Sequence, residues 1–203
     1  MRELLLGMAG ESNLDTDTLS KMHQLRHRVF REKLRWNVSG HNGEEIDEYD
    51  QLNPHYMIAL EDGEATACWR LLPTQGPYML RNTFGELLRG EPLPEAEDVW
   101  ELSRFAVLSP ARKYNGQIHL SMVAFEMFDK LIRFADERGI SRYVTVVSTS
   151  VERLMKSNGI TLTRFGDKKI SDVDGVRSVA CWISMDARTR ATVSNAMITA
   201  KTA

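Results

Sequence analysis

The sequence has few cysteines, no long apolar run and almost no net charge, and each of these absences excludes a class of protein. Two isolated cysteines, Cys68 and Cys181, cannot make a disulfide framework or a zinc cluster, so we expect a reducing compartment. No segment approaches the roughly 20 apolar residues of a membrane span. The net charge of −2 creates no overall field that would attract nucleic acid. We therefore expect a cytoplasmic protein that binds neither membranes nor nucleic acid.

The residues that are present have an ordinary globular composition. Apolar residues make up 42% of the chain and charged residues 27%, which excludes disorder, collagen and coiled coil as descriptions of the whole chain. A chain of 203 residues lies at the upper end of the size range of one domain. We expect residues 1–203 to form a single domain, with a polar tail from about residue 187 at its periphery.

The hydrophobic pattern alternates between the periods of strands and helices. Asp15 or Thr16 can cap a first helix, Asp62 and Gly63 supply a hairpin turn, and Gly139 can end a long helix. The pattern predicts a helix from residue 16, further helices at 82–88, 117–138 and 151–157, and strands at 4–8, 56–60, 65–72, 100–107, 143–147, 160–165 and 176–185. This order predicts an α/β fold with a mixed central sheet flanked by helices.

The stretch from Trp100 to Val107 has the apolar content of an interior strand, yet it contains Glu101 and Arg104. Successive strand side chains point to opposite faces, so Glu101 and Ser103 are expected on one face and Arg104 on the other. Removing an ionised group from water costs several kcal/mol unless the group is paired. A carboxyl in this strand therefore predicts either a partner or a working site, and the alternative is a solvated strand face.

A run of acids lies between the first helix and the hairpin. Residues 44–50 contain five carboxylates, interleaved with Ile46 and Tyr49. Charge runs usually face solvent, but the two apolar residues predict that part of this run is anchored against the body of the protein and that some of its acids point inward.

Arg70 interrupts the apolar second strand of the predicted hairpin, and a cation there requires an acid. Asp47 and Asp50 are the candidates. Together with Arg26 they could form buried ion pairs that hold the N-terminal segment on the sheet, or they could bind a substrate. Two histidines of the first helix, His23 and His27, have the spacing of a helical metal pair but no third ligand near them, so we expect no metal.

The segment Arg112–Gly116 stands between a predicted strand and the predicted long helix, where backbone N–H groups and a helix N-terminus can receive phosphate. This placement and the order of elements resemble the Gcn5-related N-acetyltransferase architecture. Members of that family bind a phosphopantetheine thioester where the strands before and after the long helix separate. The sequence departs from the family pattern at Ile118, where a second glycine is usual.

A second resemblance, to the acyl-homoserine-lactone synthases of the LuxI type, is more specific because several short motifs agree in order and spacing. It extends from about residue 15 to residue 185. The residues that carry it are Arg26, Phe30, Trp36, Asp47, Asp50, Arg70-Leu71-Leu72-Pro73-Thr74, Pro77-Tyr78-Met79-Leu80, Phe84 and Trp100-Glu101-Leu102-Ser103-Arg104-Phe105.

The resemblance implies an acyltransferase of bacterial quorum sensing. Such an enzyme transfers an acyl group from acylated acyl carrier protein to the amine of S-adenosylmethionine and then closes a lactone, releasing methylthioadenosine. S-adenosylmethionine is therefore an expected substrate, and no cofactor is expected. The alternatives are an N-acetyltransferase of the Gcn5-related fold that uses an acyl-CoA, and an effector-binding module without catalytic activity.

The resemblance also implies roles for single residues. Glu101 is the expected general base, and Ser103 is expected to hold the acyl carbonyl or its amide. Acids suit the ammonium of S-adenosylmethionine, arginines its carboxylate, and aromatic rings its adenine and sulfonium. The expected substrate-binding residues are Arg26, Phe30, Trp36, Asp47, Asp50, Arg70, Phe84, Arg104 and Phe105.

Two further expectations concern the acyl donor. Thr145 lies where family members that prefer 3-oxo-acyl chains tend to carry threonine, so the resemblance implies a 3-oxo-acyl substrate. The acyl chain of this substrate is expected along strand 143–147. Arg153 and Lys156 resemble the basic positions that dock the acidic acyl carrier protein. The alternative for these two residues is an ordinary solvated helix face.

Overall fold

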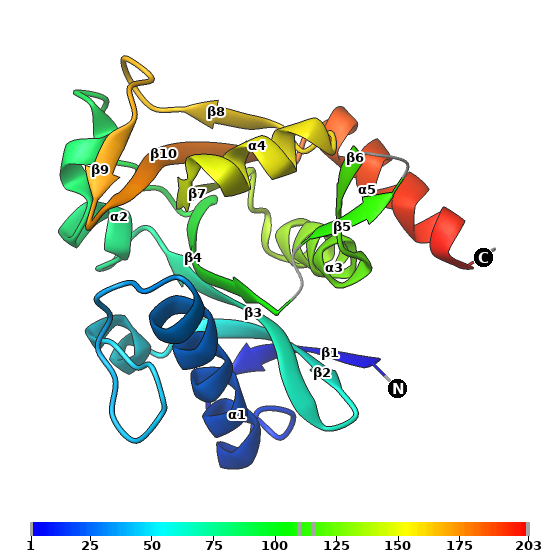
Figure 1. The fold of residues 1–203 in the computed structure, drawn as a ribbon. Helices are drawn as coiled ribbons and strands as arrows, with labels where there is room; N and C mark the ends of the chain where they lie inside the picture. Colours follow the sequence, from blue (N-terminus) through cyan, green and yellow to red (C-terminus); the bar gives the residue numbers. More distant parts are fainter. Residues whose placement is uncertain (1, 109–110, 115–116, 202–203) are drawn as a thin grey trace. The chain divides into compact units, whose positions relative to one another are not determined.

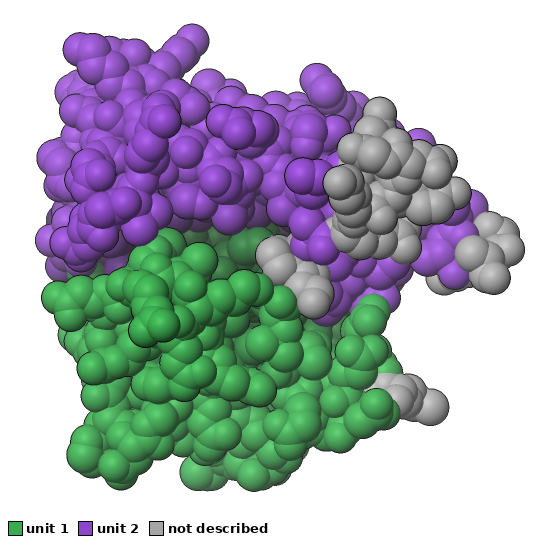
Figure 2. Space-filling view, viewed as in Figure 1, with its two compact units in different colours: residues 1–72, 102–109 green, residues 73–101, 110–203 purple. Residues whose placement is uncertain are grey.

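The computed structural model describes residues 2–108, 111–114 and 117–201. It divides into two compact units, which Figure 2 colours separately. The first unit comprises residues 1–72 and 102–109, and the second comprises residues 73–101 and 110–203. The expectation of a single domain stays a prediction.

Antiparallel strands form the sheet of the first unit. Its strands, in spatial order, are β1 (Arg2–Met8), β2 (His55–Glu61), β3 (Glu64–Pro73) and residues 102–107 of β4 (Val99–Val107). The predicted hairpin is confirmed: Asp62 and Gly63 join β2 to β3 with φ values of 52° and 82°, as a two-residue type I′ turn requires.

A continuous helical segment packs on this sheet (Figure 1). The α-helix α1 (Thr16–Arg26) begins where the Asp15 carboxylate accepts the backbone N–H of Thr18 at 2.8 Å, which confirms the predicted cap. The segment then widens into a π-helix, η1 (His27–Lys33), a rare form that often occurs at functional sites. Met22, Leu25 and Phe30 pack against apolar residues of the sheet, including Ile58 and Ala106.

The strands of the second unit fall into two groups. The larger contains β7 (Arg142–Ser148), β10 (Val176–Ser184), β8 (Leu162–Arg164) and β9 (Ser171–Val173), and β10 pairs antiparallel with the other three. The smaller is a hairpin of β5 (Ala111–Tyr114) and β6 (Gln117–Leu120). Residues 99–101 of β4 also belong to this unit.

The β5–β6 hairpin corrects the predicted long helix. Residues 117–120 pair with β5, and Ser121 has an extended backbone, so α3 (Met122–Arg138) begins five residues later than expected. Its end at Gly139, with φ 68°, is confirmed. The predicted phosphate loop is therefore followed by a strand rather than by a helix N-terminus. Two of its residues, Asn115 and Gly116, lie outside the described residues.

The remaining helices of the second unit are α2 (Met79–Asn82), the 3₁₀ turn η3 (Gly85–Leu88), α4 (Thr149–Ser157) and α5 (Ala187–Lys201). The short helix predicted at 82–88 is thus two pieces, with Phe84 between them in a non-helical conformation.

The residues from 187, expected as a polar tail at the periphery, form helix α5. It packs against α3 (Figure 1), and Arg190 donates two hydrogen bonds to Asp136 of that helix, at 2.6 and 2.9 Å. Thr189 and Val193 are buried. Among the described residues, no helix is long and apolar enough to cross a membrane.

Candidate active site

Three arginines and three carboxylates meet in the interior of the first unit. These six residues, called the ion cluster below, are Arg26, Glu45, Asp47, Asp50, Arg70 and Arg104. Arg104 is the most exposed, with 13% of its side chain accessible, and the others are accessible to 4% or less. Their formal charges sum to zero, so each buried charge has a counter-charge, which the burial of ions requires.

The acidic run places its carboxylates in the cluster through local backbone geometry. Asp47 begins the 3₁₀ turn η2 (Glu48–Leu52) and accepts the backbone N–H of Tyr49 at 2.9 Å, while Asp50 accepts the backbone N–H of Asp47 at 2.8 Å. This reciprocal capping box orients both acids through local backbone contacts that do not involve the arginines. Tyr49 is buried as expected, but Ile46 is 37% exposed, so its predicted role as an anchor was wrong.

The acid partners predicted for Arg70 are confirmed. Its two terminal nitrogens donate to Asp47, one of them at 3.1 Å, and one also donates to Asp50 at 2.8 Å. Its Nε donates to the hydroxyl oxygen of Ser103 at 3.1 Å, and its guanidinium lies 5.5 Å from the centre of the Tyr49 ring.

Arg26 is fully buried and forms a second set of pairs. Its terminal nitrogens donate to the two Asp50 oxygens at 2.8 and 2.9 Å, and its Nε donates to Glu45. Asp50 therefore joins Arg26 to Arg70, and Glu45 joins Arg26 to Arg104, whose Nε lies 3.0 Å from the other Glu45 oxygen.

Arg104 has a left-handed backbone conformation, with φ 56°, in the middle of β4. The strict alternation predicted for this strand therefore fails after Ser103, and neighbouring residues such as Ala106 and Val107 are both buried. A left-handed conformation costs a residue with a side chain about 1–2 kcal/mol. The ion pairs of its guanidinium with Glu45 and with Asp47, at 2.6 Å, offset this cost.

Aromatic rings lie next to the exposed end of the ion cluster. The Arg104 guanidinium lies 5.7 Å from the centre of the Phe30 ring, and Trp36 stacks on Phe30 with a centroid distance of 5.2 Å and an angle of 13°. Phe105 packs on Trp69 at 4.6 Å. Trp36 and Phe105 are each half-buried.

Burial and charge act in opposite directions on the ion cluster. Burial alone would raise the pKa of Asp50, but hydrogen bonds and charges from Arg26 and Arg70 outweigh it and hold the pKa well below its usual value. Burial likewise opposes the charge of Arg26, yet Asp50 and Glu45 raise the pKa of its guanidinium. Asp50 and Arg26 are therefore both charged at neutral pH.

Glu101 lies in the second unit and is buried, with 1% of the residue exposed. One carboxylate oxygen accepts the backbone N–H of Met79 at 2.9 Å, and the other accepts that of Leu80 at 2.7 Å. The expected alternative of a solvated strand face is thereby excluded for this side chain. Phe84, two residues after the end of α2, is half-buried and donates its backbone N–H to the carbonyl of Met79.

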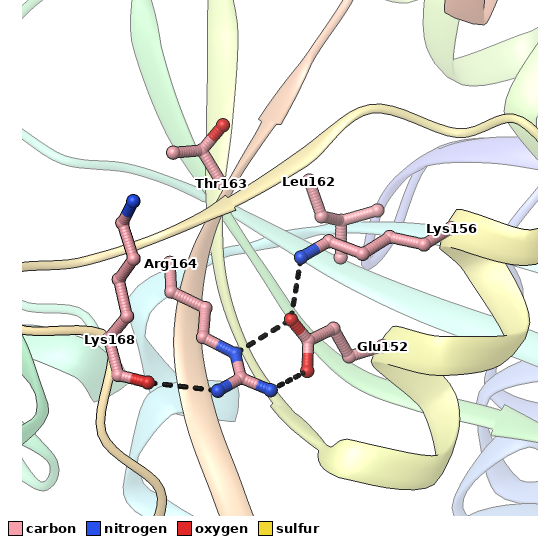
Figure 3. Close-up of a pocket in the computed structure, with 6 residues that line it drawn as sticks. All are labelled: Glu152, Lys156, Leu162, Thr163, Arg164 and Lys168. Carbon is pink, nitrogen blue, oxygen red and sulfur yellow. Dashed lines mark hydrogen bonds and ion pairs between the residues drawn. The ribbon is translucent and has the colours of Figure 1, made fainter.

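The residues expected to bind the acyl donor also lie in the second unit. Thr145 is buried on β7, opposite Cys181 of β10. Lys156 of α4 lines an open pocket of about 410 Å³, shown in Figure 3. Its Nζ lies 2.8 Å from Glu152, whose other oxygen pairs with Arg164 at 2.6 Å. Arg153 is exposed on the same helix.

Two members of this arrangement, Glu45 and Tyr56, were not predicted from the sequence. Glu45 is fully buried and pairs with two arginines, and Tyr56 donates its hydroxyl to Asp50 at 2.8 Å. Glu45 could have been predicted, because it lies two residues before Asp47 and residues two apart in an extended segment point to the same side. Tyr56 gave no signal beyond its place in an apolar strand.

Comparison with known proteins places this arrangement in a family. The profile of a family described as autoinducer synthase matches residues 11–191. The acyl-homoserine-lactone synthase of Vibrio anguillarum is 43% identical over 173 residues, which cover 84% of this chain and 88% of the relative.

Solved structures agree with this result. The crystal structure of the synthase LasI is 37% identical, with a TM-score of 0.83 over 96% of this chain and 95% of that one. TofI, solved with an inhibitor and MTA, is 30% identical, with a TM-score of 0.78 over 95% and 96% of the two chains.

More distant structures share the fold alone. One of them is BjaI, described as CoA-dependent and solved with SAM and isopentyl-CoA, at 23% identity and a TM-score of 0.79 over 96% of this chain and 89% of that one. Another is an acyl-CoA N-acyltransferase from Pseudomonas aeruginosa, at 13% identity and a TM-score of 0.55 over 90% of this chain and 99% of that one. The predicted fold class, a mixed α/β fold of the N-acetyltransferase kind, is confirmed.

Proposed function

The chain belongs to the autoinducer synthase family and is an acyltransferase of the acyl-homoserine-lactone synthase type, and we propose that it joins S-adenosylmethionine to an acyl group delivered by acyl carrier protein. The observation that carries this proposal is the ion cluster with its adjoining aromatic pair, Phe30 and Trp36. An amino acid that also carries a sulfonium and an adenine needs charges of both signs beside aromatic faces.

The amino-acid end of the substrate is proposed to bind at Arg104. Its side chain is the most exposed of the ion cluster, so its guanidinium can meet a carboxylate without the burial of a new unpaired charge. The half-buried Trp36, stacked on Phe30, offers a face for the adenine or the sulfonium. Asp47, which contacts both Arg70 and Arg104, is proposed as the acid that meets the ammonium.

Acyl transfer requires the ammonium to lose a proton before its nitrogen attacks the thioester carbonyl. We propose that Glu101 accepts this proton, directly or through one water, because its carboxylate is buried and held in orientation by two backbone N–H groups. The new C–N bond forms as the thioester C–S bond breaks, and the carrier leaves as a thiol. Ser103, whose oxygen accepts from Arg70, can donate its hydroxyl proton to the acyl carbonyl.

Lactone closure requires no general acid. The carboxylate oxygen of the acylated substrate attacks the carbon bound to the sulfonium, the C–S bond breaks, and methylthioadenosine leaves as a neutral molecule with the bonding electron pair. Holding the carboxylate in line with that bond is therefore the main contribution of the protein to this step. The guanidinium of Arg104, fixed by Glu45 and Asp47, is suited to this task.

The acyl donor is proposed to dock on α4. Arg153 is exposed there, and Lys156, Arg164 and Lys168 line the adjoining pocket, so this surface carries more positive than negative charge. An acidic carrier protein would be attracted to it, and the attraction would weaken as salt is added. An acyl-CoA carries the same phosphopantetheine arm and is the alternative donor.

A charge reversal tests this docking surface. We expect Arg153→Glu to raise the KM for acyl carrier protein by roughly tenfold at low salt and to remove most of its salt dependence. Arg133→Glu is the matched control, because Arg133 is exposed on α3 of the same unit and pairs only with its neighbour Asp129 among the contacts described. Equal KM values for the two variants would contradict docking at α4.

The acyl group is proposed to be a 3-oxo chain bound at Thr145, which is buried on β7. Rates with carriers loaded with 3-oxo and unsubstituted chains of one length test this directly, and a preference for the unsubstituted chain contradicts it.

One assay tests the function as a whole. Purified protein is given S-adenosylmethionine with a panel of acyl carrier proteins and acyl-CoAs, and acyl-homoserine lactone and methylthioadenosine are measured by mass. We expect both products in equal amounts, with faster turnover from acyl carrier protein. An acylated amine without lactone would favour an N-acetyltransferase, and tight binding of S-adenosylmethionine without any product would favour a binding module.

A further inference from the structure

Asp50 accepts more hydrogen bonds than any other carboxylate described in the ion cluster. Its Oδ1 accepts from Arg26, Arg70 and the Tyr56 hydroxyl, each at 2.8 Å. Its Oδ2 accepts from Arg26 at 2.9 Å and from the backbone N–H of Asp47 at 2.8 Å. A carboxylate offers about four lone-pair positions, so five donors occupy all of them. Asp50 is therefore committed to positioning the two arginines and has no acceptor position for a substrate.

Tyr56 is the one neutral side chain among these donors. It lies on β2 directly opposite Arg70 of β3 and is 2% exposed, and its ring makes a T-shaped contact with the His23 ring at a centroid distance of 6.2 Å. Burial and the neighbouring Asp50 charge raise the pKa of Tyr56 above its ordinary value, so the phenol keeps its proton and stays a donor. A charged donor at this place would leave the cluster with an unbalanced buried charge, which the hydroxyl avoids.

Asp50 is coupled to the rest of the site through Arg70. Arg70 donates to Asp50, to Asp47 and to Ser103, and Asp47 in turn pairs with Arg104. A rotation of the Asp50 carboxylate therefore displaces the donors that orient Ser103 and Asp47. Displacements of about 1 Å in groups that hold a substrate can cost up to about a hundredfold in rate or affinity.

We propose that Tyr56 is a positioning residue of the substrate site, whose hydroxyl holds Asp50 between Arg26 and Arg70 and thereby sets Arg70, Ser103 and Arg104 for S-adenosylmethionine. The proposal rests on the proposed function, because it names the substrate of the same site. It assigns Tyr56 no contact with the substrate and no part in proton transfer.

The test is Tyr56→Phe, which keeps the ring and its contact with His23 and removes only the hydroxyl. We expect the KM and the Kd for S-adenosylmethionine to rise about tenfold, which corresponds to one hydrogen bond to a charged acceptor. The KM for the acyl carrier should stay within about twofold of the wild type, because the docking surface on α4 is untouched.

Thr189→Val is the matched control. Thr189 is fully buried on α5, away from every site proposed here, and its hydroxyl oxygen accepts the backbone N–H of Thr161 at 3.1 Å, so this variant also loses one buried hydrogen bond. Denaturation midpoints of both variants are measured, and the kinetic comparison is made at a temperature where both are folded. We expect similar losses of stability and a rise in the KM for S-adenosylmethionine only in Tyr56→Phe.

Two results would overturn the inference: an unchanged Kd for S-adenosylmethionine in folded Tyr56→Phe, or an equal rise in the Thr189→Val control. A wild-type protein that neither binds S-adenosylmethionine nor forms lactone would instead overturn the proposed function. Calorimetric titration of the wild type with S-adenosylmethionine, done first, separates the two failures.

Discussion

The ion cluster of the first unit and the salt bridges around Glu152 of the second use the same chemistry in opposite settings. The cluster balances three arginines against three acids, and no member exposes more than 13% of its side chain. Around Glu152, two cations share one acid at the edge of an open pocket, with 25% of Arg164 and 43% of Lys156 exposed. Figure 3 shows both cations directed at the Glu152 carboxylate.

This difference suits the ion cluster to holding a substrate in position and the Glu152 region to attracting a charged partner. A closed and neutral cluster exerts little field outside itself but holds each guanidinium in one orientation, which suits the recognition of a small zwitterion. An open set with excess positive charge holds its groups less firmly but attracts an anionic partner over a distance set by the salt concentration. The substrate site and the proposed docking site therefore differ in their tolerance of substitution, and the following predictions test that difference.

The largest effect is expected from Asp50→Ala. Removing this acid leaves Arg26 and Arg70 buried with too few counter-charges, so the free energy of unfolding should fall by about 3–5 kcal/mol in urea denaturation. Asp136→Ala is the control, because Asp136 also binds an arginine through both oxygens but is 56% exposed. Its loss should be below about 1 kcal/mol. Similar losses in both variants would show that burial does not decide the effect.

A smaller effect is expected from Glu152→Gln. The substitution weakens the pairs with Arg164 and Lys156, but both cations are partly exposed and water can replace the lost contacts. The free energy of unfolding should fall by about 1–2 kcal/mol. The pocket loses one negative charge and its net charge becomes more positive, so the KM for acyl carrier protein at low salt should fall. A rise in that KM would argue against electrostatic attraction at this surface.

The smallest effect is a pH dependence at the border of the ion cluster. Burial lowers the pKa of His23, and the positive charge of Arg26 adds to this, while Asp50 opposes it. The unfolded histidine titrates near pH 6.5, so the folded protein binds fewer protons below that pH. Neutral His23 therefore contributes its full stabilisation above about pH 6.5. This contribution is lost as the pH falls from there through the lower pKa that His23 has in the folded protein.

His23→Gln should flatten this dependence. Urea midpoints of the wild type are expected to fall between about pH 7.5 and about pH 5.5, and the fall should be smaller in the variant. His41→Gln serves as the control, because His41 is exposed and outside the ion cluster. An equal fall in all three proteins would assign the pH dependence to other groups.

Features fixed by local chemistry were predictable from the sequence. The Asp15 cap, the Asp62-Gly63 turn and the helix end at Gly139 each depend on a few adjacent residues, and all three are present. The acids for Arg70 were predictable because a cation in an apolar strand has few other ways to be satisfied.

Features fixed by distant contacts were not predictable. Residues 117–120 are a strand because β5 pairs with them, and no local signal outweighed their helical pattern. Helix α5 has no strong apolar stripe in its sequence, and its docking depends on Arg190 meeting Asp136 of α3. The left-handed conformation of Arg104 follows from ion pairs with Glu45 and Asp47, which lie about sixty residues earlier in the chain. The helix and strand preferences of single residues do not contain information about such distant contacts.

The assignment of Glu101 as the general base is tested most directly by turnover of Glu101→Gln. The substitution puts an NH₂ group against one of two backbone donors, so stability should fall by about 1–3 kcal/mol. Thr74→Val is the control, because the fully buried Thr74 hydroxyl also contacts the backbone, at Val99 and Ala96. With both variants folded, we predict that kcat for lactone formation falls at least about a hundredfold in Glu101→Gln and stays near the wild-type value in Thr74→Val. A kcat in Glu101→Gln within about threefold of the control would contradict the assignment.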